Sequence, residues 1–468
     1  MKPIALGKIF TGTDLDPEIE ISFVGTDSRV IKEGSLFVAL KGEKFDGHNF
    51  VKQVLDNGAV GAVVCGDRLS ILKEQLGPEE QKKLIVVEDT LLELGKIAAK
   101  VRDNLDIPVV GITGSVGKTS TKDLTACALA PSGDVAKTKL NYNNEIGLPL
   151  TIFSVEDDHT ALVGEMGMRG LGEIEYLAEI LRPDLGIITN IGVSHIERLG
   201  SRKNIMLAKT EICAGLKKGA TLLVGYGDRH SDDEVSKEAI RDCVEAYGKD
   251  IKVKFCGIDT MDDYYGFDVG TDTDGKMSFT FSATGDRVHL QLAGVHNVRN
   301  AVMALAAAYE LKIPVKDAVK EVEKYCGDSV RQNIIKKNGI TIIDDTYNAG
   351  PESMQAALAV LNTLPGIKRK IAVLGSMLEL GEASEQAHRD VLEAAVKNEV
   401  DILITVGVTW GQTPESCPVK IKENCETWQE AIPVIKNLCG DRHCEGDGFL
   451  VKGSHAMAME NIVKFLEE

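Results

Sequence analysis

The sequence lacks the features that would assign it to a membrane or to nucleic acid. No uninterrupted apolar run approaches the roughly 20 residues that a membrane-spanning helix needs. Residues 1–10 have neither the long apolar segment nor the small-residue cleavage site of a secretory signal. The formal net charge is -18, so the negatively charged backbone of a nucleic acid would repel the protein, and no excess of basic residues offsets this repulsion. We therefore expect a cytoplasmic protein with no membrane span and no nucleic-acid partner.

Paired cysteine motifs are also missing. The chain has 10 scattered cysteines, and no two of them form a CxxC pair. This argues against a zinc ribbon and against a thioredoxin-like motif. Cys439, His443 and Cys444 lie close together in the sequence and could bind a metal. Reduced cytosolic thiols are the simpler interpretation.

The chain has 468 residues, which is too long for one ordinary core. Its apolar patterning divides it into three segments, which we predict to be domains: residues 1–104, 105–327 and 328–468. The first segment holds short strand-like runs and helical stretches bounded by turn residues. Its strands are expected at 35–40 and 59–64, and its helices at 50–58 and 90–105.

The second and third segments alternate strand-like with helical runs, which is typical of a mostly parallel sheet covered on both faces. Residues 251–292 differ, because alternating apolar residues between polar turns predict antiparallel strands. The other strands are expected at 107–112, 161–164, 185–189, 221–224, 341–344, 370–374, 402–406 and 448–451, and a helix at 297–312. The fold class is therefore α/β with three domains.

A phosphate-binding loop follows the first strand of the second segment. The loop comprises Gly114, Ser115, Val116, Gly117, Lys118 and Thr119, and Ser120 leads on into a helix. Such a loop aims backbone N–H groups and the positive end of a helix dipole at one point. The lysine adds a charge for the outer phosphates, and the threonine hydroxyl can bind Mg²⁺. A chance glycine turn is disfavoured because strand, loop and helix fall in order. The segment therefore predicts an ATP-binding domain like that of phosphate-loop ATPases.

Two further polar residues follow predicted strands of the same sheet. Glu165 comes after the run 161–164, at the edge where open α/β sheets bind ligands, and could hold Mg²⁺. His195 follows the strand 185–189 and could be a metal ligand or an acid–base group. A solvated carboxylate and a structural histidine are the alternatives. Lys209, by itself, is typical of a solvated surface charge.

Eight stretches of the chain, in order, resemble the Mur ligase family. They are Thr113–Thr119, Asn141–Asn144 with Gly147, Pro149 and Thr151, Gly164–Gly167, Asn190–Glu197, Gly294–Ala301, Asp344–Ser353, Leu374–Gly381 with His388, and Lys452–Ser454. Within the family, the likeness favours the branch that adds D-alanyl-D-alanine to UDP-N-acetylmuramoyl-tripeptide. Two features favour this branch: the paired aspartates before Tyr347, and His388 after LGSMLELG. No run like DNP[AR]R, typical of the preceding ligase, occurs.

The resemblance implies an ATP-dependent acid–amino-acid ligase of peptidoglycan synthesis, and hence of cell-wall biogenesis, cell shape and division. The tripeptide carboxylate would be phosphorylated to an acyl phosphate, and the dipeptide amine would displace phosphate. The products would be ADP, phosphate and the UDP-muramoyl-pentapeptide. The family also implies a UDP-substrate-binding N-terminal domain, a Rossmann-like C-terminal domain, small-molecule substrates and a monomer.

The resemblance also implies roles for single residues. The catalytic residues would be Lys118, Lys209 and His195, with Lys209 carbamylated. Thr119 and Glu165 would hold one Mg²⁺, and His195 and the Lys209 carbamate would help to hold a second. Nucleotide-binding residues beyond the loop would be Asn297, Asn300, Arg331 and Asp345. Substrate-binding residues would be Ser28, Arg29, Lys41, Asp46, Gly47, His48, Asn143, Asn144, Thr151, Tyr347, Asn348 and Lys452.

Two departures from the family pattern bear on the C-terminal domain. Gly350 stands where the family usually has asparagine, and His455 where it usually has arginine. A histidine offers no bidentate fork for the carboxylate of the incoming dipeptide. Two alternatives also remain at this stage. One is a sister amide ligase, either a murein tripeptide ligase or an enzyme like folylpolyglutamate synthase. The other is a nucleotide-binding switch or kinase.

Overall fold

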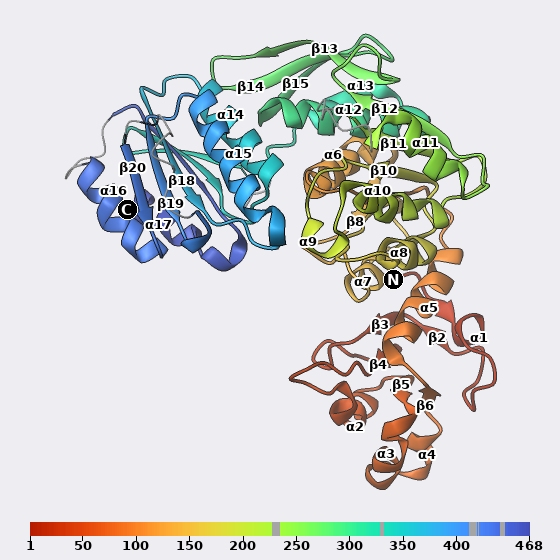
Figure 1. The fold of residues 1–468 in the computed structure, drawn as a ribbon. Coiled ribbons are helices and arrows are strands. Elements are labelled where there is room, and N and C mark those ends of the chain that lie inside the picture. The colour runs from red at the N-terminus through yellow and green to blue at the C-terminus, as the bar shows by residue number, and fades with distance from the viewer. Residues whose placement is uncertain (227–234, 328–331, 411–418, 420, 440–444) are drawn as a thin grey trace.

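The structure is a computed structural model that describes residues 1–226, 235–327, 332–410, 419, 421–439 and 445–468. His443, Cys444 and Arg331, considered above, lie outside the described residues. Figure 1 shows three bodies: an N-terminal one below, a central one above it, and a C-terminal one beside the centre. In the part of the chain that is described, no helix is long and apolar enough to cross a membrane.

The N-terminal body is built on a parallel sheet of four strands in the order β3-β4-β5-β6. Its strands are β3 (Phe23–Gly25), β4 (Ser35–Val38), β5 (Gly61–Cys65) and β6 (Leu84–Val87). Three short helices connect them: α2 (Val51–Asp56), α3 (Leu69–Gln75) and α4 (Pro78–Gln81). A small antiparallel pair, β1 (Ile4–Ala5) and β2 (Glu20–Ile21), and α1 (Leu6–Ile9) complete it. The predicted strands at 35–40 and 59–64 are confirmed.

Helix α5 (Thr90–Asp103) joins this body to the centre. It begins where Asp89 accepts hydrogen bonds from the backbone N–H groups of Leu91 and Leu92, which satisfies donors left free by the first turn. At its other end, Arg102 is only 6% exposed. Its guanidinium donates to the carbonyls of Leu181, Arg182 and Leu105 and to the Asp184 carboxylate. These bonds fix the end of α5 on the central body.

The central body is a sheet of nine strands in the order β15-β14-β13-β12-β11-β10-β7-β9-β8. Its strands are β7 (Val109–Thr113), β8 (Asp134–Lys137), β9 (His159–Glu165), β10 (Leu185–Ile188), β11 (Thr221–Gly225), β12 (Lys252–Gly257), β13 (Tyr264–Thr271), β14 (Lys276–Phe281) and β15 (Arg287–Ala293). The prediction of antiparallel strands over 251–292 holds for β13–β15 and is wrong for β12. That strand pairs in parallel with β11 and so extends the parallel part of the sheet, with its last three residues, 255–257, buried.

Helices cover both faces of the central sheet. One set comprises α6 (Lys118–Leu129), α12 (Val295–Glu310) and α13 (Val315–Val322); the other comprises α5, α7 (Gly147–Phe153), α8 (Glu173–Leu181), α10 (Arg202–Thr210) and α11 (Lys237–Glu245). Neighbouring residues of one strand belong to different cores: Val110 packs with the first set and Val109 with the second. The second core also takes in apolar residues of the N-terminal body, such as Ile4 and Leu94. Alternation along each strand therefore builds two cores from one sheet.

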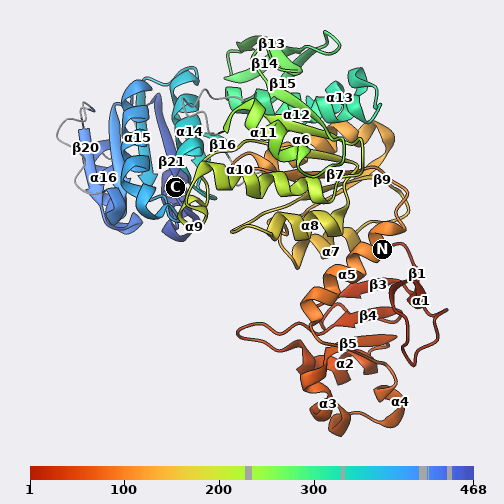
Figure 2. The same ribbon diagram turned by 45° about the vertical axis from the view of Figure 1, so that its right-hand side comes forward.

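The C-terminal body is a six-stranded sheet in the order β16-β17-β21-β18-β19-β20, with all pairs parallel except β16 with β17. Its strands are β16 (Asn333–Lys337), β17 (Ile340–Asp345), β18 (Arg369–Gly375), β19 (Ile402–Val406), β20 (Ile421–Cys425) and β21 (Asp447–Lys452). Helices α14 (Pro351–Thr363) and α15 (Ser384–Lys397) cover one face, and α16 (Trp428–Cys439) and α17 (Glu460–Glu467) the other. Figure 2 shows this doubly covered sheet beside the central body. The three sheets lie within the three predicted segments, and the domain boundaries themselves stay a prediction.

We expect Arg102→Met to lower the free energy of unfolding by about 3 kcal/mol, because three carbonyls and a carboxylate lose a buried donor. Chemical denaturation followed by circular dichroism measures this. Lys100→Met, an exposed neighbour on α5, is the matched control and should change little. Equal effects of the two substitutions would contradict the role given to Arg102.

Candidate active site

A cavity of about 1310 Å³ lies between the central and C-terminal bodies. Fifteen of the residues predicted from the sequence line it: Ser115, Val116, Gly117, Lys118, Thr119, Ser120, Asn143, Glu165, His195, Asn297, Asn300, Asp345, Tyr347, Asn348 and Lys452. They come from strands and helices far apart in the sequence. The carboxyl ends of the parallel strands supply most of them, since those ends share one edge of each sheet.

The phosphate loop, residues 114–119, runs from β7 to α6. Gly114 has a φ of +149°, and a Cβ there would lie 1.8 Å from Thr189 Oγ1. Gly117 has a φ of +81° and is the residue from which α6 begins. Gly114 is required because Thr189 leaves no room for a side chain. Both residues also have a positive φ, which favours glycine. The loop ends at the helix N-terminus, where the first N–H groups have no partner within the helix.

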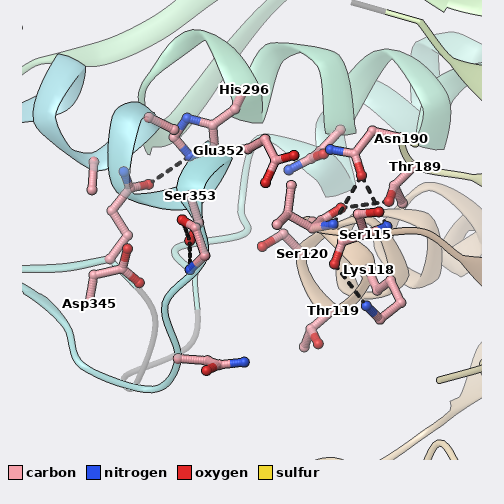
Figure 3. A pocket seen from close by; sticks show the side chains of 18 of the residues that line it. Ser115, Lys118, Thr119, Ser120, Thr189, Asn190, His296, Asp345, Glu352 and Ser353 are labelled. Carbon is pink, nitrogen blue, oxygen red and sulfur yellow. Dashed lines mark hydrogen bonds between the residues drawn. The ribbon is translucent and has the colours of Figure 1, made fainter. Parts of the chain in front are cut away.

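Asn190, which follows β10, holds the start of this loop. Its side-chain oxygen accepts hydrogen bonds from the backbone N–H groups of Ser115 (3.1 Å) and Val116 (3.0 Å). Thr189 donates to the carbonyl of Val116 (2.6 Å), and Ser115 Oγ accepts from Gly192 N (3.0 Å). Figure 3 shows these contacts beside Lys118 and Thr119. Sequence reasoning gave Asn190 no role, although its place after a parallel strand next to β7 was a usable signal.

Lys118 lies at the first turn of α6. Its Nζ donates to the carbonyls of Gly114 (2.8 Å) and Ser115 (3.1 Å). Both of these acceptors are neutral carbonyls. A phosphate that binds Lys118 therefore does not have to replace an ion pair at either of them. That placement suits neutralisation of charge on the outer phosphates.

Thr119 and Glu165 meet across β7 and β9. Thr119 Oγ1 donates to Glu165 Oε2 (2.9 Å), and Asn143 Nδ2 donates to Glu165 Oε1 (2.9 Å). The Glu165 side chain is only 2% exposed, and its backbone N–H donates to Thr138 Oγ1. A hydroxyl and a carboxylate side by side near a phosphate loop fit Mg²⁺, which takes one or two carboxylates along with phosphate oxygens. In the described ranges no group of three or more His, Cys, Asp or Glu side chains gathers as a metal cluster.

Lys209, on α10, is 1% exposed. Its ammonium has no hydrogen bond or ion pair within the described residues. Burial, and then the neighbouring charge of Lys118, lower the pKa of Lys209 well below its ordinary value. The neutral form of the amine is therefore favoured more than it is in water. A neutral amine is the form that reacts with CO₂, so the site fits carbamylation.

His195 faces the same region from the loop after β10. Burial, reinforced by the charge of Lys118, lowers its pKa to about 4, so the ring is neutral at pH 7. A neutral imidazole has a lone pair available for a metal. Its Nδ1 lies 3.4 Å from Glu379 Oε2 of the C-terminal body. His195 has a φ of 66°, a conformation uncommon outside glycine.

The start of α12 forms the far side of the cavity. Asn297 Nδ2 donates to the carbonyl of Ala293 and to Gln332 Oε1, and Asn300 accepts from Thr121 of α6. Both asparagines thus tie α12 to its neighbours and line the cavity where an adenine is predicted. Of the other predicted nucleotide residues, Asp345 accepts from Lys452 Nζ (2.6 Å).

The remaining predicted substrate residues have different settings. Asn144 accepts from the backbone N–H of Gly147, and Thr151 is buried and donates to the carbonyl of Gly147, so both shape the start of α7. Asn143 alone of that group lines the cavity.

Arg169, just beyond Glu165, also lines the cavity and is exposed. Sequence reasoning missed this residue.

The predicted residues of the N-terminal body lie outside the cavity, at the carboxyl ends of β3 and β4. They are Ser28, Arg29, Lys41, Asp46, Gly47 and His48. Arg29 pairs with Asp27, and exposed as it is, it can exchange that partner for a ligand. His48 is 4% exposed, and its ring nitrogens bond Asp46 Oδ1 and the Cys65 N–H, which shapes the loop instead of presenting the ring.

The fold and the site together define an ATP-using enzyme of three α/β bodies, with its phosphate loop facing a Rossmann-like body across one cavity. Comparisons with known proteins agree. The Mur ligase middle domain matches residues 112–308, the Mur ligase glutamate ligase domain matches 330–455, and the Mur ligase family catalytic domain matches 20–102. The UDP-N-acetylmuramoyl-tripeptide--D-alanyl-D-alanine ligase of Bacillus subtilis is 35% identical, over 99% of this chain and 97% of that protein.

Solved structures show the same likeness. A crystal structure of MurF from Acinetobacter baumannii superposes with a TM-score of 0.86 at 32% identity, covering 100% of both chains. MurF ligase from Thermotoga maritima, in complex with ADP, superposes with a TM-score of 0.78 at 28% identity, covering 95% of this chain and 97% of that one. The chain belongs to the Mur ligase family, whose members are ATP-dependent ligases. The predicted fold class is confirmed.

We expect Asn190→Ala to weaken nucleotide binding about tenfold, because two loop N–H groups lose the acceptor that orients them. Isothermal titration with ADP and Mg²⁺ measures the affinity, and the thermal midpoint checks that the fold survives. Asn398→Ala, at the end of α15, removes an amide that bonds only locally and serves as the control. Unchanged ADP affinity in Asn190→Ala would refute the role of this residue.

Proposed function

We infer that this chain adds D-alanyl-D-alanine to UDP-N-acetylmuramoyl-tripeptide, using ATP and an acyl-phosphate intermediate. One observation carries the inference: the phosphate loop and the stretch Asp344–Ser353 line the same cavity. Full-length likeness to ligases named for that reaction supports it. The product is the UDP-muramoyl-pentapeptide of peptidoglycan synthesis.

The first half-reaction needs a nucleophile placed in line with the terminal phosphate of ATP. The loop N–H groups and the N-terminus of α6 bind the phosphates, and Lys118 offsets their charge. Thr119 and Glu165 would hold Mg²⁺, which supplies further neutralisation of the phosphate oxygens. Asn143, bonded to Glu165 at the substrate side, is placed to orient the tripeptide. Phosphorylation turns a carboxylate oxygen into a leaving group.

The second half-reaction needs the dipeptide amine close to the acyl carbon. We assign its delivery to the C-terminal body, whose Tyr347, Asn348 and Lys452 face the cavity. Lys452 is buried and donates to Asp345 and to the Asn348 carbonyl, which fixes the strand ends around the site. The body thereby contributes positioning, which can supply much of the rate enhancement. Asp345 and Arg331 stay predicted nucleotide residues.

The departures at positions 350 and 455 affect this body differently. Gly350 begins α14 in an extended conformation, and Ser353 bonds its backbone N–H, so the helix start is intact. The ring of His455 lies 6.2 Å from that of Tyr347, at the rim of the cavity. We propose that this ring pair contacts the dipeptide where relatives use an arginine.

The remaining roles are proposals of the same kind. His195 and a carbamate on Lys209 would hold a second Mg²⁺, and the neutral states of both side chains fit that role. The UDP portion would bind at the loops after β3 and β4, through Ser28, Arg29, Lys41, Asp46, Gly47 and His48. Asn144 and Thr151 would act on the peptide by shaping the α7 start. We place the reaction in the cytoplasm, where ATP is available, and expect a monomer.

The alternatives are less well supported. A nucleotide-binding switch or kinase does not account for the C-terminal motifs lining the cavity. A sister ligase for glutamate or a diamino acid is disfavoured, because relatives that match nearly the whole chain at 30–35% identity are named for D-alanyl-D-alanine.

We expect phosphate release that depends on all of ATP, Mg²⁺, UDP-muramoyl-tripeptide and D-alanyl-D-alanine. A coupled assay for inorganic phosphate, with each component omitted in turn, measures it. Replacing the dipeptide by glutamate or by a diamino acid is the control for the sister ligases. Release that is indifferent to the dipeptide would rule out this function.

We expect Lys209→Ala to lose activity by a factor of at least about one hundred, and to regain part of it with added short carboxylates. A small carboxylate can occupy the space left by the side chain and supply the missing negative oxygens. Mass spectrometry of the intact wild-type protein under CO₂ at neutral pH provides a direct check for the carbamate. Absence of rescue, together with absence of the adduct, would favour a simple charge role for Lys209.

A further inference from the structure

Among the contacts between the C-terminal body and the centre, two carboxylates reach one loop. This loop, residues 189–195, runs from β10 to α9 (Ile196–Leu199), and we call it the β10–α9 loop. Glu352, the second residue of α14, accepts a hydrogen bond through Oε1 from the backbone N–H of Val193 at 2.7 Å. Glu379 lies 3.4 Å from His195 of the same loop. Two carboxylates of the C-terminal body therefore reach the same short segment of the central body.

The other side of the β10–α9 loop holds the phosphate loop. Asn190 accepts from the N–H groups of Ser115 and Val116, and Gly192 N donates to Ser115 Oγ. Only two residues separate the contact at Asn190 from the contact at Val193. Figure 3 shows the Glu352 side chain extending from α14 toward Asn190 and Ser115. A displacement of α14 would therefore be transmitted to the phosphate loop through the short segment from Val193 to Asn190.

Gly192 shows how closely Glu352 is seated. A Cβ at residue 192 would lie 2.2 Å from Glu352 Oε1 and 2.8 Å from its Cδ. The next atom, Ser115 Cβ, is 3.3 Å away, a distance that small shifts can accommodate. Glu352 is therefore the main obstacle to a side chain at this position. The absence of a side chain at 192 makes room for a carboxylate from the other body.

The Glu352 carboxylate is only partly satisfied. Oε1 takes the Val193 N–H, but Oε2 is buried and has no hydrogen-bond partner within the described residues. Burying a carboxylate with an unpaired oxygen is unfavourable, so packing alone does not explain its presence. A function for the bond between Glu352 and the Val193 N–H, at the junction of the two bodies, accounts for it. Hydrogen bonds to an ionised acceptor are among the stronger ones.

We propose that Glu352 is a positioning residue that couples the seating of the C-terminal body to the conformation of the phosphate loop, through the Val193 N–H and the β10–α9 loop. Glu352 touches neither nucleotide nor substrate in this role. The coupling is reciprocal, so a nucleotide that orders the phosphate loop also favours the seated C-terminal body. The proposal needs only nucleotide binding, and it does not depend on which amine the enzyme joins.

Hydrogen exchange of the full chain, read by mass spectrometry over peptides covering residues 190–199, tests the contact without catalysis. We expect Glu352→Ala to speed exchange at Val193 at least about tenfold, because the acceptor is lost. Glu352→Gln keeps an acceptor oxygen and should stay within about threefold of wild type. Glu393→Ala, an exposed glutamate on α15 of the same body, is the matched control. Wild-type exchange in Glu352→Ala would overturn the proposal.

Nucleotide affinity tests the coupling. We expect Glu352→Ala to weaken binding of a non-hydrolysable ATP analogue with Mg²⁺ about fivefold to tenfold, and Glu352→Gln to bind nearly as wild type. A glutamine variant as weak as the alanine variant would overturn the assigned role of the hydrogen bond. Unchanged affinity in Glu352→Ala, with faster exchange at Val193, would overturn the coupling. Neither readout uses the dipeptide, so a different amine substrate would leave these results unaffected.

A double-mutant cycle ties the effect to this contact. Gly192→Ala should displace Glu352 and weaken analogue binding about as much as Glu352→Ala does. In the Glu352→Ala background the new methyl group has room, and Gly192→Ala should then cost less than about twofold more. Non-additivity of this kind supports the proposal. Additive losses would mean that residue 192 acts on the phosphate loop alone, and would overturn it.

Discussion

The site depends on the adjacency of β7 and β10 in the central sheet. Because the two strands are parallel neighbours, the loops that follow them leave from the same edge. The phosphate loop would otherwise present unpaired N–H groups along a glycine-rich turn. Instead, the Asn190 side chain accepts two of them, and Thr189 bonds the Val116 carbonyl. The loop is thereby shaped in advance, which lowers the entropy lost when phosphate binds.

Buried charge around the loop follows from the same geometry. The side chains of Glu165 and Lys209 are both buried, at 2% and 1% exposure, yet they differ in their hydrogen-bond partners. The Glu165 carboxylate accepts hydrogen bonds from Thr119 and Asn143, so its charge is supported. Lys209 receives no partner within the described residues and responds by favouring its neutral form. A supported carboxylate and a neutral amine are the states that a metal-assisted phosphoryl transfer can use.

The C-terminal body completes the cavity, and polar contacts join it to the centre at several places. Glu352 and Glu379 reach one loop, and Gln332 bonds His296 and Asn297 at the start of α12. Ala293 of β15 packs into the core of the C-terminal body, while the other core residues of the two bodies fall in separate clusters. The N-terminal body is different. It shares a core with the centre and is held by the buried Arg102, so it behaves as an extension of the central body.

The sequence by itself determined the fold class and the phosphate loop, because strand and helix periodicity and loop spacing are local properties, and the family resemblance added Asn143, Asn297 and Asn300. Glu165 and His195 were found because they follow strands that share an edge. Only the tertiary structure decided which partner each residue has. It gave roles to Asn190 and Glu352, placed β12 in the parallel sheet, and set His48 inside a hydrogen-bonded loop. Burial and neighbouring charge lower the pKa of Lys209, and both arise from residues distant in the chain, which no local pattern reports.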